Sequence, residues 1–317
     1  MDIPFLDDEQ VAALTPWPEL VDALRDAFRG DGEAPTRHHH EIPGVDRDDI
    51  TMLIMPAWNP AGDFGVKLAN VVRSNDALGL PTLYGLYMLF DGRTGKPQAI
   101  LDAGALTARR TAAASALASR SLSREDSRVL LVIGTGRVAG ELVAAHCSVR
   151  PIEEVRIWGR NPEHAREAAN RAKSACGVAC VSVPDIQAAA ADADIITSAT
   201  PAEEPLLLGE WITSGTHVDL VGAFKPIMCE ADPALISKAD QVFVDTVEDA
   251  LEEAGDLIQA AEAGSFSFDD VAGDLRRIAS VQHSLRNSPD EITVFKSVGS
   301  ALEDLAAAQL CLRMRAG

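Results

Sequence analysis

One short stretch restricts the fold of this chain more than any other. An apolar run at residues 129–133 passes directly into the sequence Gly134-Thr135-Gly136-Arg137-Val138-Ala139. In a GxGxxA pattern after a strand, the first glycine permits a tight turn, the second lets the backbone approach a pyrophosphate, and the alanine lets helix and strand pack closely. The helix that starts here directs free amides and the positive end of its dipole at the phosphates. Residues 134–139 are therefore predicted to bind a dinucleotide.

The sequence around this motif alternates short apolar runs with alanine-rich helical stretches. Runs of about five apolar residues separated by amphipathic helices indicate parallel strands that are covered on both faces. Helices are expected at 161–176 and 184–191, and strands at 128–133, 154–158, 179–183, 194–198, 216–221 and 241–245. The predicted fold class is α/β, with a Rossmann doubly wound parallel sheet.

The N-terminal region and the C-terminal tail lack this alternation. An amphipathic helix is expected at 18–29 and longer helices at 107–121 and 300–315, while strand-like segments occur at 37–42, 51–57, 65–72 and 82–90. The glycine-containing turn at 91–96 predicts a hairpin to a strand at 98–102. Residues 124–296 are therefore assigned to the Rossmann domain and residues 1–123 to a separate α+β domain. Residues 297–317 are expected to leave the Rossmann domain and pack on this α+β domain, which periodicity alone does not establish.

Charge and composition exclude several classes of function. The net charge of −20 repels nucleic acid, so an anionic substrate must be captured by a few locally placed Arg and Lys side chains. No apolar run approaches the roughly 20 residues that span a bilayer, and the acidic N-terminus does not resemble a signal peptide. These features predict a cytoplasmic protein without membrane association. The five cysteines form no metal-ligand pattern, and His38-His39-His40 would alternate faces on a strand, so no metal site is predicted.

Two further loops are expected to bind the cofactor. The second Rossmann strand ends in Gly159-Arg160-Asn161, where an NAD site usually carries an acidic residue for the ribose hydroxyls. Arg160 instead suits a 2′-phosphate, so NADPH is favoured and NADH is the alternative. The other interpretation is that Arg160 only caps a surface turn. Ala199 and Thr200 follow the fourth strand, where a nucleotide commonly lies against the loop, although an ordinary loop also explains them.

Three cations lie inside apolar segments of the N-terminal region: Arg37, Lys67 and Arg110. A buried cation is costly unless an anion pairs with it. A substrate carboxylate would supply that anion. Internal salt bridges with some of the 48 acidic residues are the competing interpretation.

Several segments together resemble the ornithine cyclodeaminase/μ-crystallin family, in the family's order and over nearly the whole chain. They are Gly65-Val66-Lys67, Leu106-Thr107-Ala108-Arg109-Arg110-Thr111, Gly134-Thr135-Gly136 and Thr293-Val294-Phe295-Lys296-Ser297-Val298-Gly299. The resemblance implies a homodimer, with an N-terminal substrate and dimerisation domain that the C-terminal helix completes. The family includes ornithine and lysine cyclodeaminases, an alanine dehydrogenase and ketimine reductases.

The resemblance also implies roles for individual residues. Arg37, Lys67 and Arg110 match the family's carboxylate-binding positions. Asn70 and Thr82 match polar positions near them, Thr111 matches a position at the cofactor, and Ser297-Val298-Gly299 match one beside the nicotinamide. Lys67 is the candidate catalytic residue, either as a carboxylate anchor or as the source of a proton for the imine.

One segment departs from the cyclodeaminases of the family. They resemble one another in a Gly-Gly-Asp-Cys-Pro-Gly-Lys segment after the fifth strand, whose Asp handles the substrate's amino group. Here the segment reads Val221-Gly222-Ala223-Phe224-Lys225-Pro226, with Val221 expected at the cofactor and Phe224 at the substrate. A phenyl ring cannot pair with an ammonium or carry its proton. The segment instead resembles that of bacterial reductases of Δ1-pyrroline-2-carboxylate and Δ1-piperideine-2-carboxylate, whose ring suits an apolar wall.

The sequence therefore predicts an NADPH-dependent reductase that converts a cyclic ketimine carboxylate to L-proline or L-pipecolate. The first alternative is an ornithine cyclodeaminase or a related NAD-dependent amino-acid dehydrogenase, in which Asp219 or Asp256 would replace the missing acid. The second alternative is a non-catalytic NADPH-binding protein similar to μ-crystallin.

Overall fold

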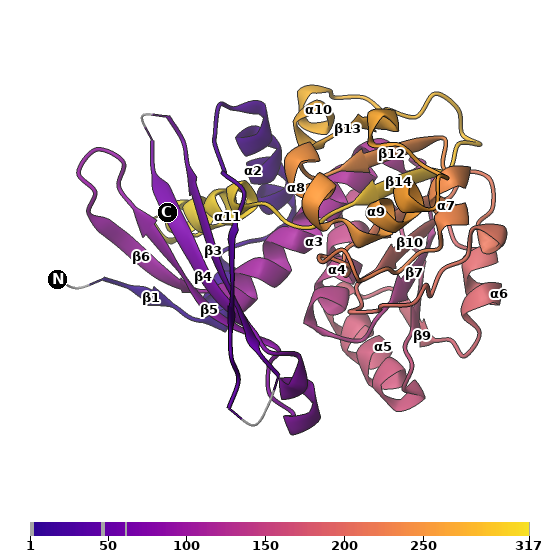
Figure 1. Ribbon diagram of the computed structural model, residues 1–317, viewed down its shortest axis with the longest axis horizontal. Coiled ribbons are helices and arrows are strands. Elements are labelled where there is room, and N and C mark those ends of the chain that lie inside the picture. The colour runs from indigo at the N-terminus through magenta and orange to yellow at the C-terminus, as the bar shows by residue number, and fades with distance from the viewer. Residues whose placement is uncertain (1–2, 46–47, 61, 317) are drawn as a thin grey trace. The chain divides into compact units, whose positions relative to one another are not determined.

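The computed structural model describes residues 3–45, 48–60 and 62–316, which divide into two compact units. One unit contains the chain up to Arg110 and the segment from Ser300 onward, and the other runs from Thr111 to Gly299 (Figure 1). The first division falls inside a continuous helix, α3 (Ala103–Leu122). The sequence-based boundaries at 123/124 and 296/297 lie at different points, and those domain bounds stay a prediction.

The N-terminal unit is built on a six-stranded sheet with the order β1-β6-β5-β4-β3-β2. Neighbouring strands are antiparallel, except that β1 and β6 are parallel. The predicted hairpin joins β5 to β6, and the Asp91 amide donates to the Lys96 carbonyl at 2.9 Å. The strands are β1 (Phe5–Leu6), β2 (His38–Ile42), β3 (Ile50–Trp58), β4 (Phe64–Val71), β5 (Leu83–Phe90) and β6 (Pro97–Asp102).

The two faces of this sheet differ. The C-terminal helix α11 (Ala301–Ala316) contacts β3, β4, β5 and α2 (Trp17–Arg29), whose apolar stripe buries Leu20, Leu24 and Phe28. On the other face, alternate residues of β4 and β5 leave large apolar side chains exposed: Phe64, Leu68, Tyr84 and Leu86. The unit also contains α1 (Asp8–Ala13) and a 3₁₀ segment, η1 (Arg73–Leu78).

The second unit contains an eight-stranded sheet with the order β13-β12-β14-β11-β10-β7-β8-β9, and all its pairs are parallel. The α/β Rossmann fold class is thus confirmed. The chain starts in the middle of the sheet at β7 and later returns to its other side, so the carboxyl ends of β7 and β10 flank a topological switch point, where ligands bind in such sheets. The strands are β7 (Val129–Ile133), β8 (Glu154–Trp158), β9 (Ala179–Ser182), β10 (Ile195–Ser198), β11 (His217–Leu220), β12 (Gln241–Val244), β13 (Val271–Gly273) and β14 (Thr293–Lys296).

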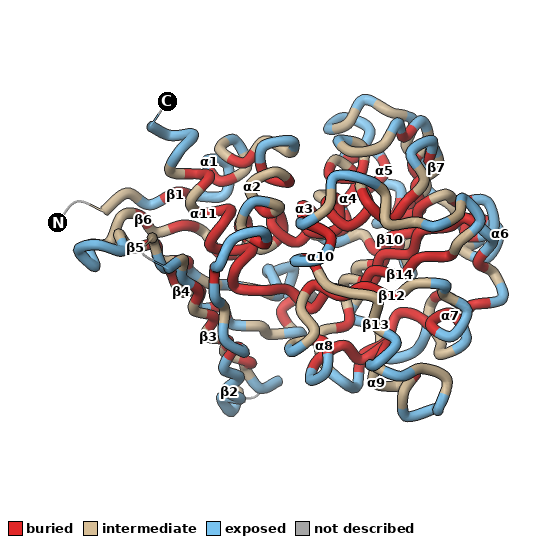
Figure 2. Tube along the Cα trace, turned by 90° about the horizontal axis from the view of Figure 1, so that it is seen from above, coloured by how far each residue is buried: buried red, intermediate tan, exposed pale blue. Residues whose placement is uncertain are grey.

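Helices cover this sheet and bury its central strands (Figure 2). The apolar residues of β7 divide between two core clusters, with Leu131 and Ile133 in one and Leu130 and Val132 in the other. This division is what a strand covered on both faces requires. The helices are α4 (Arg137–Val149), α5 (Pro162–Cys176), α6 (Ile186–Ala191), α7 (Pro233–Lys238), α8 (Val247–Glu253), α9 (Gly255–Glu262) and α10 (Leu275–Ser280), with 3₁₀ segments η2 (Gly209–Trp211) and η3 (Phe268–Asp270).

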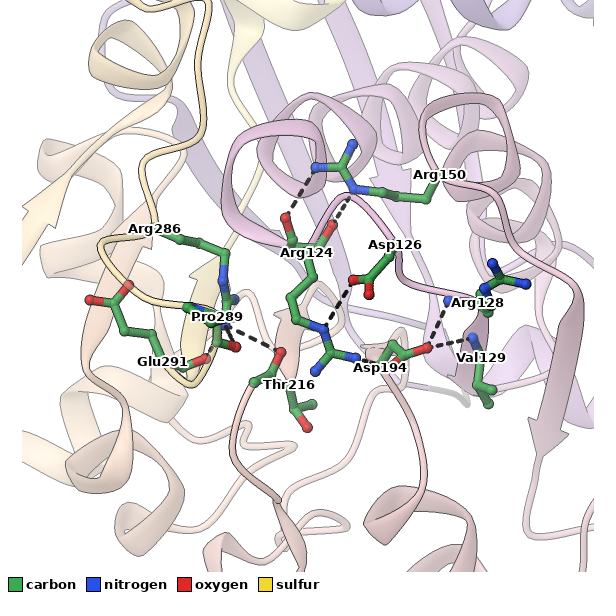
Figure 3. Close-up of polar contacts among 12 residues, drawn as sticks. Arg124, Asp126, Arg128, Val129, Arg150, Asp194, Thr216, Arg286, Pro289 and Glu291 are labelled. Carbon is green, nitrogen blue, oxygen red and sulfur yellow. Dashed lines mark hydrogen bonds and ion pairs between the residues drawn. The ribbon is translucent and has the colours of Figure 1, made fainter.

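Two arginines of the second unit, Arg150 and Arg286, donate to carbonyls at the C-terminal end of α3. Figure 3 shows both side chains together with the polar contacts of Arg124, which follows this helix. Arg150 donates to the carbonyls of Ser119 at 3.0 Å and Arg120 at 2.6 Å, and Arg286 donates to the carbonyl of Leu122 at 2.7 Å. The last carbonyls of a helix lack intrahelical partners and carry its negative dipole end, so cations stabilise them.

The described residues contain no helix with the length and hydropathy needed to cross a bilayer. They also contain no group of three or more His, Cys, Asp or Glu side chains placed to hold a metal ion. The histidine run forms β2, at the edge of the sheet, and all its residues are exposed.

Candidate functional site

The glycine-rich turn connects β7 to α4 in the backbone conformation that its first glycine allows. Gly134 has φ +124°, and a Cβ atom there would lie 2.7 Å from the carbonyl oxygen of Ala199. The turn therefore packs directly against the loop that follows β10. Ala139 is buried in the core between α4 and the sheet, where a larger side chain would push the helix away.

The N-terminus of α4 lacks a side-chain cap. Its N-cap residue is Gly136, which has no side chain that could cap the helix. A Cβ atom at this position would meet nothing within 4 Å. Gly136 is exposed, and the first amides of this 13-residue helix have no intrahelical partner. An anionic group such as a pyrophosphate fits this position in charge and in room.

The loop after β8 contains the three residues predicted to recognise the ribose. A Cβ atom at Gly159 would lie 2.6 Å from Cγ2 of Thr135, so the two loops approach closely. The Asn161 side chain caps α5 by accepting from the Glu163 amide at 2.9 Å. Arg160 is exposed and makes no hydrogen bond or ion pair with the described residues, which leaves its guanidinium available for a ligand.

A single carboxylate joins the loops that follow β10 and β11. One oxygen of Glu230 accepts from the Thr200 amide at 2.7 Å, and the other accepts from the Gly222 amide at 2.6 Å. Burial raises the pKa of this carboxyl to about 7, against the opposing effect of Lys296. Ala199, Thr200 and Val221 are half-buried at these strand ends, and Phe224 packs partly against the core.

Asp245, at the end of β12, fixes the segment predicted to lie beside the nicotinamide. Its Oδ2 accepts from the Ser297 hydroxyl at 3.1 Å, from the Val298 amide at 2.8 Å and from the Gly299 amide. Gly299 has φ +89°, in the left-handed region. A shared acceptor of this kind holds three consecutive residues in one conformation.

The N-terminal unit brings two of the three predicted substrate cations together. Lys67 Nζ lies 2.8 Å from Oδ2 of Asp304, and Arg110 lies 3.1 Å from the other oxygen of Asp304 and 2.7 Å from Glu303. Arg37 is buried, and its positive charge is near enough to lower the pKa of Lys67. Internal salt bridges, the competing interpretation from the sequence, are therefore present for Lys67 and Arg110.

Lys67 is 2% exposed, and burial lowers the pKa of its ammonium to about 8, against the opposing effect of Asp304. The charges of Arg110 and Arg37 add to the decrease. Its ammonium also donates to the Thr107 hydroxyl at 3.3 Å. A lysine with a pKa near neutrality can both carry a charge and release a proton.

Asn70 and Thr82 do not join this cluster. Residues of β4 alternate in burial, with Lys67 and Ala69 buried and Asn70 exposed, so Asn70 lies on the opposite face of the strand from Lys67. Thr82 is exposed just before β5. Their place in the substrate site stays a prediction. Thr111 is buried on α3, next in sequence to Arg110.

The sequence reasoning missed the acidic partners in both units. Glu303 and Asp304 are fully buried in α11, and two adjacent acids within an Ala- and Leu-rich helix were the available signal. Glu230 lies in an irregular segment, where no sequence pattern marks it.

Asp219 and Asp256, the acids considered as replacements at Phe224, both have internal partners. Asp219 accepts from the Thr197 hydroxyl at 2.6 Å and from Ser115 at 3.1 Å. Asp256 accepts from the Glu230 amide at 2.6 Å and pairs with Lys296 at 2.8 Å. Both side chains are buried.

The chain is similar to known proteins over almost all of its length. A model of the ornithine cyclodeaminase/mu-crystallin family matches residues 4–314. The Delta(1)-pyrroline-2-carboxylate reductase of Paracoccus denitrificans is 38% identical over 95% of this chain and 93% of that protein.

Two solved structures extend this similarity to the fold. The Thermococcus litoralis Delta(1)-pyrroline-2-carboxylate reductase in complex with NADH and L-proline has a TM-score of 0.93 and 30% identity, over 99% of this chain and 98% of that one. The iminosuccinate reductase of Paracoccus denitrificans in complex with NAD+ has a TM-score of 0.87 and 26% identity, over 99% and 96% of the two chains. The chain therefore belongs to the ornithine cyclodeaminase/mu-crystallin family.

Proposed function

We propose that this NAD(P)-dependent family member reduces Δ1-pyrroline-2-carboxylate or Δ1-piperideine-2-carboxylate to L-proline or L-pipecolate. The observation that carries the proposal is the buried cluster of Lys67, Arg110 and Arg37 in the N-terminal unit. The relatives from Paracoccus denitrificans and Thermococcus litoralis, named as reductases of the five-membered imine, support the substrate class.

The cations would bind and orient the substrate's carboxylate. Arg110 and Arg37 can supply directional N–H donors, and Lys67 adds a compact charge beside them. Fixing the carboxylate fixes the imine carbon and nitrogen, since the ring is rigid, and orientation of this kind lowers the barrier to transfer. In a protein with a net charge of −20, this local cluster is what would retain an anion.

Reduction of the imine requires a hydride at C2 and a proton at the ring nitrogen. A bound reduced nicotinamide would supply the hydride. Lys67 would supply the proton, directly or through a water that it holds, because a pKa of about 8 leaves it protonated at neutral pH and able to release the proton. The products are the amino acid and the oxidised nicotinamide, so electrons and protons balance.

The cofactor would bind the second unit, with its pyrophosphate at residues 134–139. Thr111, Gly159, Asn161, Ala199, Thr200, Val221 and residues 297–299 are the further proposed contacts. NADPH is the proposed reductant because Arg160 is exposed and has no hydrogen-bond or ion-pair partner among the described residues, which leaves its guanidinium able to bind a 2′-phosphate. The NADH and NAD+ bound by the two structural relatives keep NADH as the alternative.

Ornithine cyclodeamination is the second candidate because the family includes that activity. It is less well supported here, since Phe224 stands where cyclodeaminases of the family carry an Asp. The nearby acids Asp219 and Asp256 are buried with internal partners.

The deciding experiment follows NADPH absorbance with each of the two cyclic ketimines, beside ammonia release from ornithine with NAD+. Rapid NADPH oxidation without ammonia release is expected. Ammonia release without ketimine reduction would overturn the proposal in favour of the cyclodeaminase.

We also propose that the chain forms a homodimer through the uncovered face of its six-stranded sheet. Phe64, Leu68, Tyr84 and Leu86 expose a contiguous set of apolar side chains on β4 and β5. Apolar sheet faces of this kind are seldom left in water. Sedimentation of the wild type should give the mass of two chains, and Leu68→Glu with Leu86→Glu should give that of one.

A further inference from the structure

Glu230 lies between the ends of two adjacent strands of the Rossmann unit, β10 and β11. Its Oε1 accepts from the Ser198 hydroxyl at 2.6 Å and from the Thr200 amide and hydroxyl at 2.7 and 3.0 Å. Its Oε2 accepts from the amides of Gly222 at 2.6 Å and Ala223 at 3.3 Å. Each carboxylate oxygen of Glu230 therefore accepts hydrogen bonds from one loop, Oε1 from the loop at β10 and Oε2 from the loop after β11.

The two loops are also in direct contact with each other. A Cβ atom at Gly222 would lie 2.2 Å from the Thr200 nitrogen and 2.0 Å from its carbonyl oxygen. Glycine at this position lets the backbones approach closely enough to share one carboxylate.

All five groups that point at Glu230 are donors, so the site fits an acceptor with no hydrogen of its own. An ionised carboxylate meets this requirement, whereas a glutamine would direct an NH₂ group at donors in one of the two loops. A buried donor left without a partner destabilises the arrangement of its loop.

A second acid, Asp256, holds the backbone of Glu230 in place. Asp256 Oδ1 accepts from the amides of Glu230 and Ala231 at 2.6 and 2.9 Å, and its Oδ2 pairs with Lys296 Nζ at 2.8 Å. Lys296 ends β14, directly before the segment that Asp245 holds. The loops after β10, β11 and β14 are therefore joined in one buried network.

We propose that Glu230 is a positioning residue that sets the relative placement of the β10 and β11 loops, and through them the placement of the nicotinamide. The inference rests on the proposed function, because the loops carry the proposed cofactor contacts Ala199, Thr200 and Val221. Glu230 itself is fully buried and acts only through the loops.

The test compares Glu230→Gln and Glu230→Asp with a matched control, Asp232→Asn. Asp232 is a nearby acid that also accepts from backbone amides, those of Gly209 at 2.8 Å and Leu235 at 2.9 Å, but it has no bond to either loop. Hydrogen exchange by mass spectrometry on peptides covering 199–204 and 221–228 measures loop order, and urea unfolding measures overall stability.

In Glu230→Gln, exchange should rise in both peptides and kcat for ketimine reduction should fall by about 10- to 100-fold. The dissociation constant of NADPH should change by less than about threefold, because the pyrophosphate turn is intact. Glu230→Asp should recover part of kcat, since it keeps the charge but is shorter by one methylene. Asp232→Asn should leave exchange in both peptides unchanged.

Unchanged hydrogen exchange in both peptides of Glu230→Gln would overturn the inference. It would also be overturned if Asp232→Asn lost the same stability and showed the same increase in hydrogen exchange. The exchange measurement needs no substrate. If the wild type reduces neither ketimine, the proposed function is wrong. The exchange measurement still decides whether Glu230 orders the two loops.

Discussion

Lys67 and Asp304 form a fully buried ion pair, 2.8 Å apart, between strand β4 and the C-terminal helix α11. The Asp304 carboxylate also forms an ion pair with Arg110, so this one acid pairs with two of the cations that the sequence assigns to substrate binding. The pair explains how two cations are kept in an apolar interior before any substrate arrives, because a buried charge without a partner is strongly unfavourable.

Replacement of Lys67 by Met should abolish turnover while leaving NADPH binding intact, because the proposed proton source and anchor is removed from the unit that does not contain the glycine-rich turn. Turnover by NADPH absorbance and binding by NADPH fluorescence would be measured in parallel. Lys173→Met, at an exposed position of α5, is the control and should retain full activity. Retained turnover in Lys67→Met would remove Lys67 from the mechanism.

The value of kcat/KM should fall as the pH rises above about 8, since the pKa of Lys67 is about 8 and its charged form predominates only below that pH. In Asp304→Asn this fall should move to lower pH, because Asp304 raises the pKa of Lys67 and its charge is lost. A fall that stays at the same pH in this variant would assign it to another group.

Asp304→Asn should also lower the free energy of unfolding by about 3–5 kcal/mol, as expected when one partner of a buried ion pair is removed. Urea unfolding at pH 7 measures the change. Asp269→Asn, which removes an exposed acid in η3, should change stability by less than about 0.5 kcal/mol. Similar losses of unfolding free energy in Asp304→Asn and Asp269→Asn would show that the buried ion pair contributes no more to stability than an exposed acid.

Arg160→Ala should raise the KM for NADPH by about 10- to 100-fold and leave the KM for NADH unchanged, because a charge-assisted bond to the 2′-phosphate is worth about 1.5–3 kcal/mol. Arg166→Ala, an exposed position on α5 that pairs with Glu163 at 2.7 Å, serves as the control. An equal effect of Arg160→Ala on both cofactors would contradict the assignment of Arg160 to the 2′-phosphate.

Gly134→Ala should lose both stability and cofactor binding, because the residue would be strained at φ +124° and its Cβ would lie 2.7 Å from the Ala199 carbonyl. Gly140→Ala, at the fourth residue of α4 with open space around its Cβ, should instead raise the free energy of unfolding by about 0.5–1 kcal/mol. Calorimetric melting and NADPH titration would distinguish the two, and equal melting temperatures would contradict the role of Gly134.

The parts of the fold that follow from local sequence could be predicted. The turn at Gly134 and the strands around it depend on short-range sterics and periodicity, and the structure confirms the parallel sheet. Strand β13, with three residues, is too short for periodicity to reveal. The place of β14 between β12 and β11 depends on a crossover that local pattern does not encode.

The candidate site was harder to predict because its charges are balanced over long sequence separations. Nothing near Lys67 or Arg110 in sequence indicates that their partners are Asp304 and Glu303. Asn70 lies three positions after Lys67 on β4, and the two-residue repeat of a strand places the two side chains on opposite faces.

The position of α11 has a consequence for synthesis of the protein. Lys67 and Arg110 are translated before the Rossmann unit, whereas their counter-ions Asp304 and Glu303 in α11 are translated after it. The Rossmann unit is one uninterrupted segment and can fold before α11 appears. The N-terminal unit can therefore complete its charge pairs only once α11 has been synthesised, and nascent chains that stop before α11 would lack the acids that pair with Lys67 and Arg110.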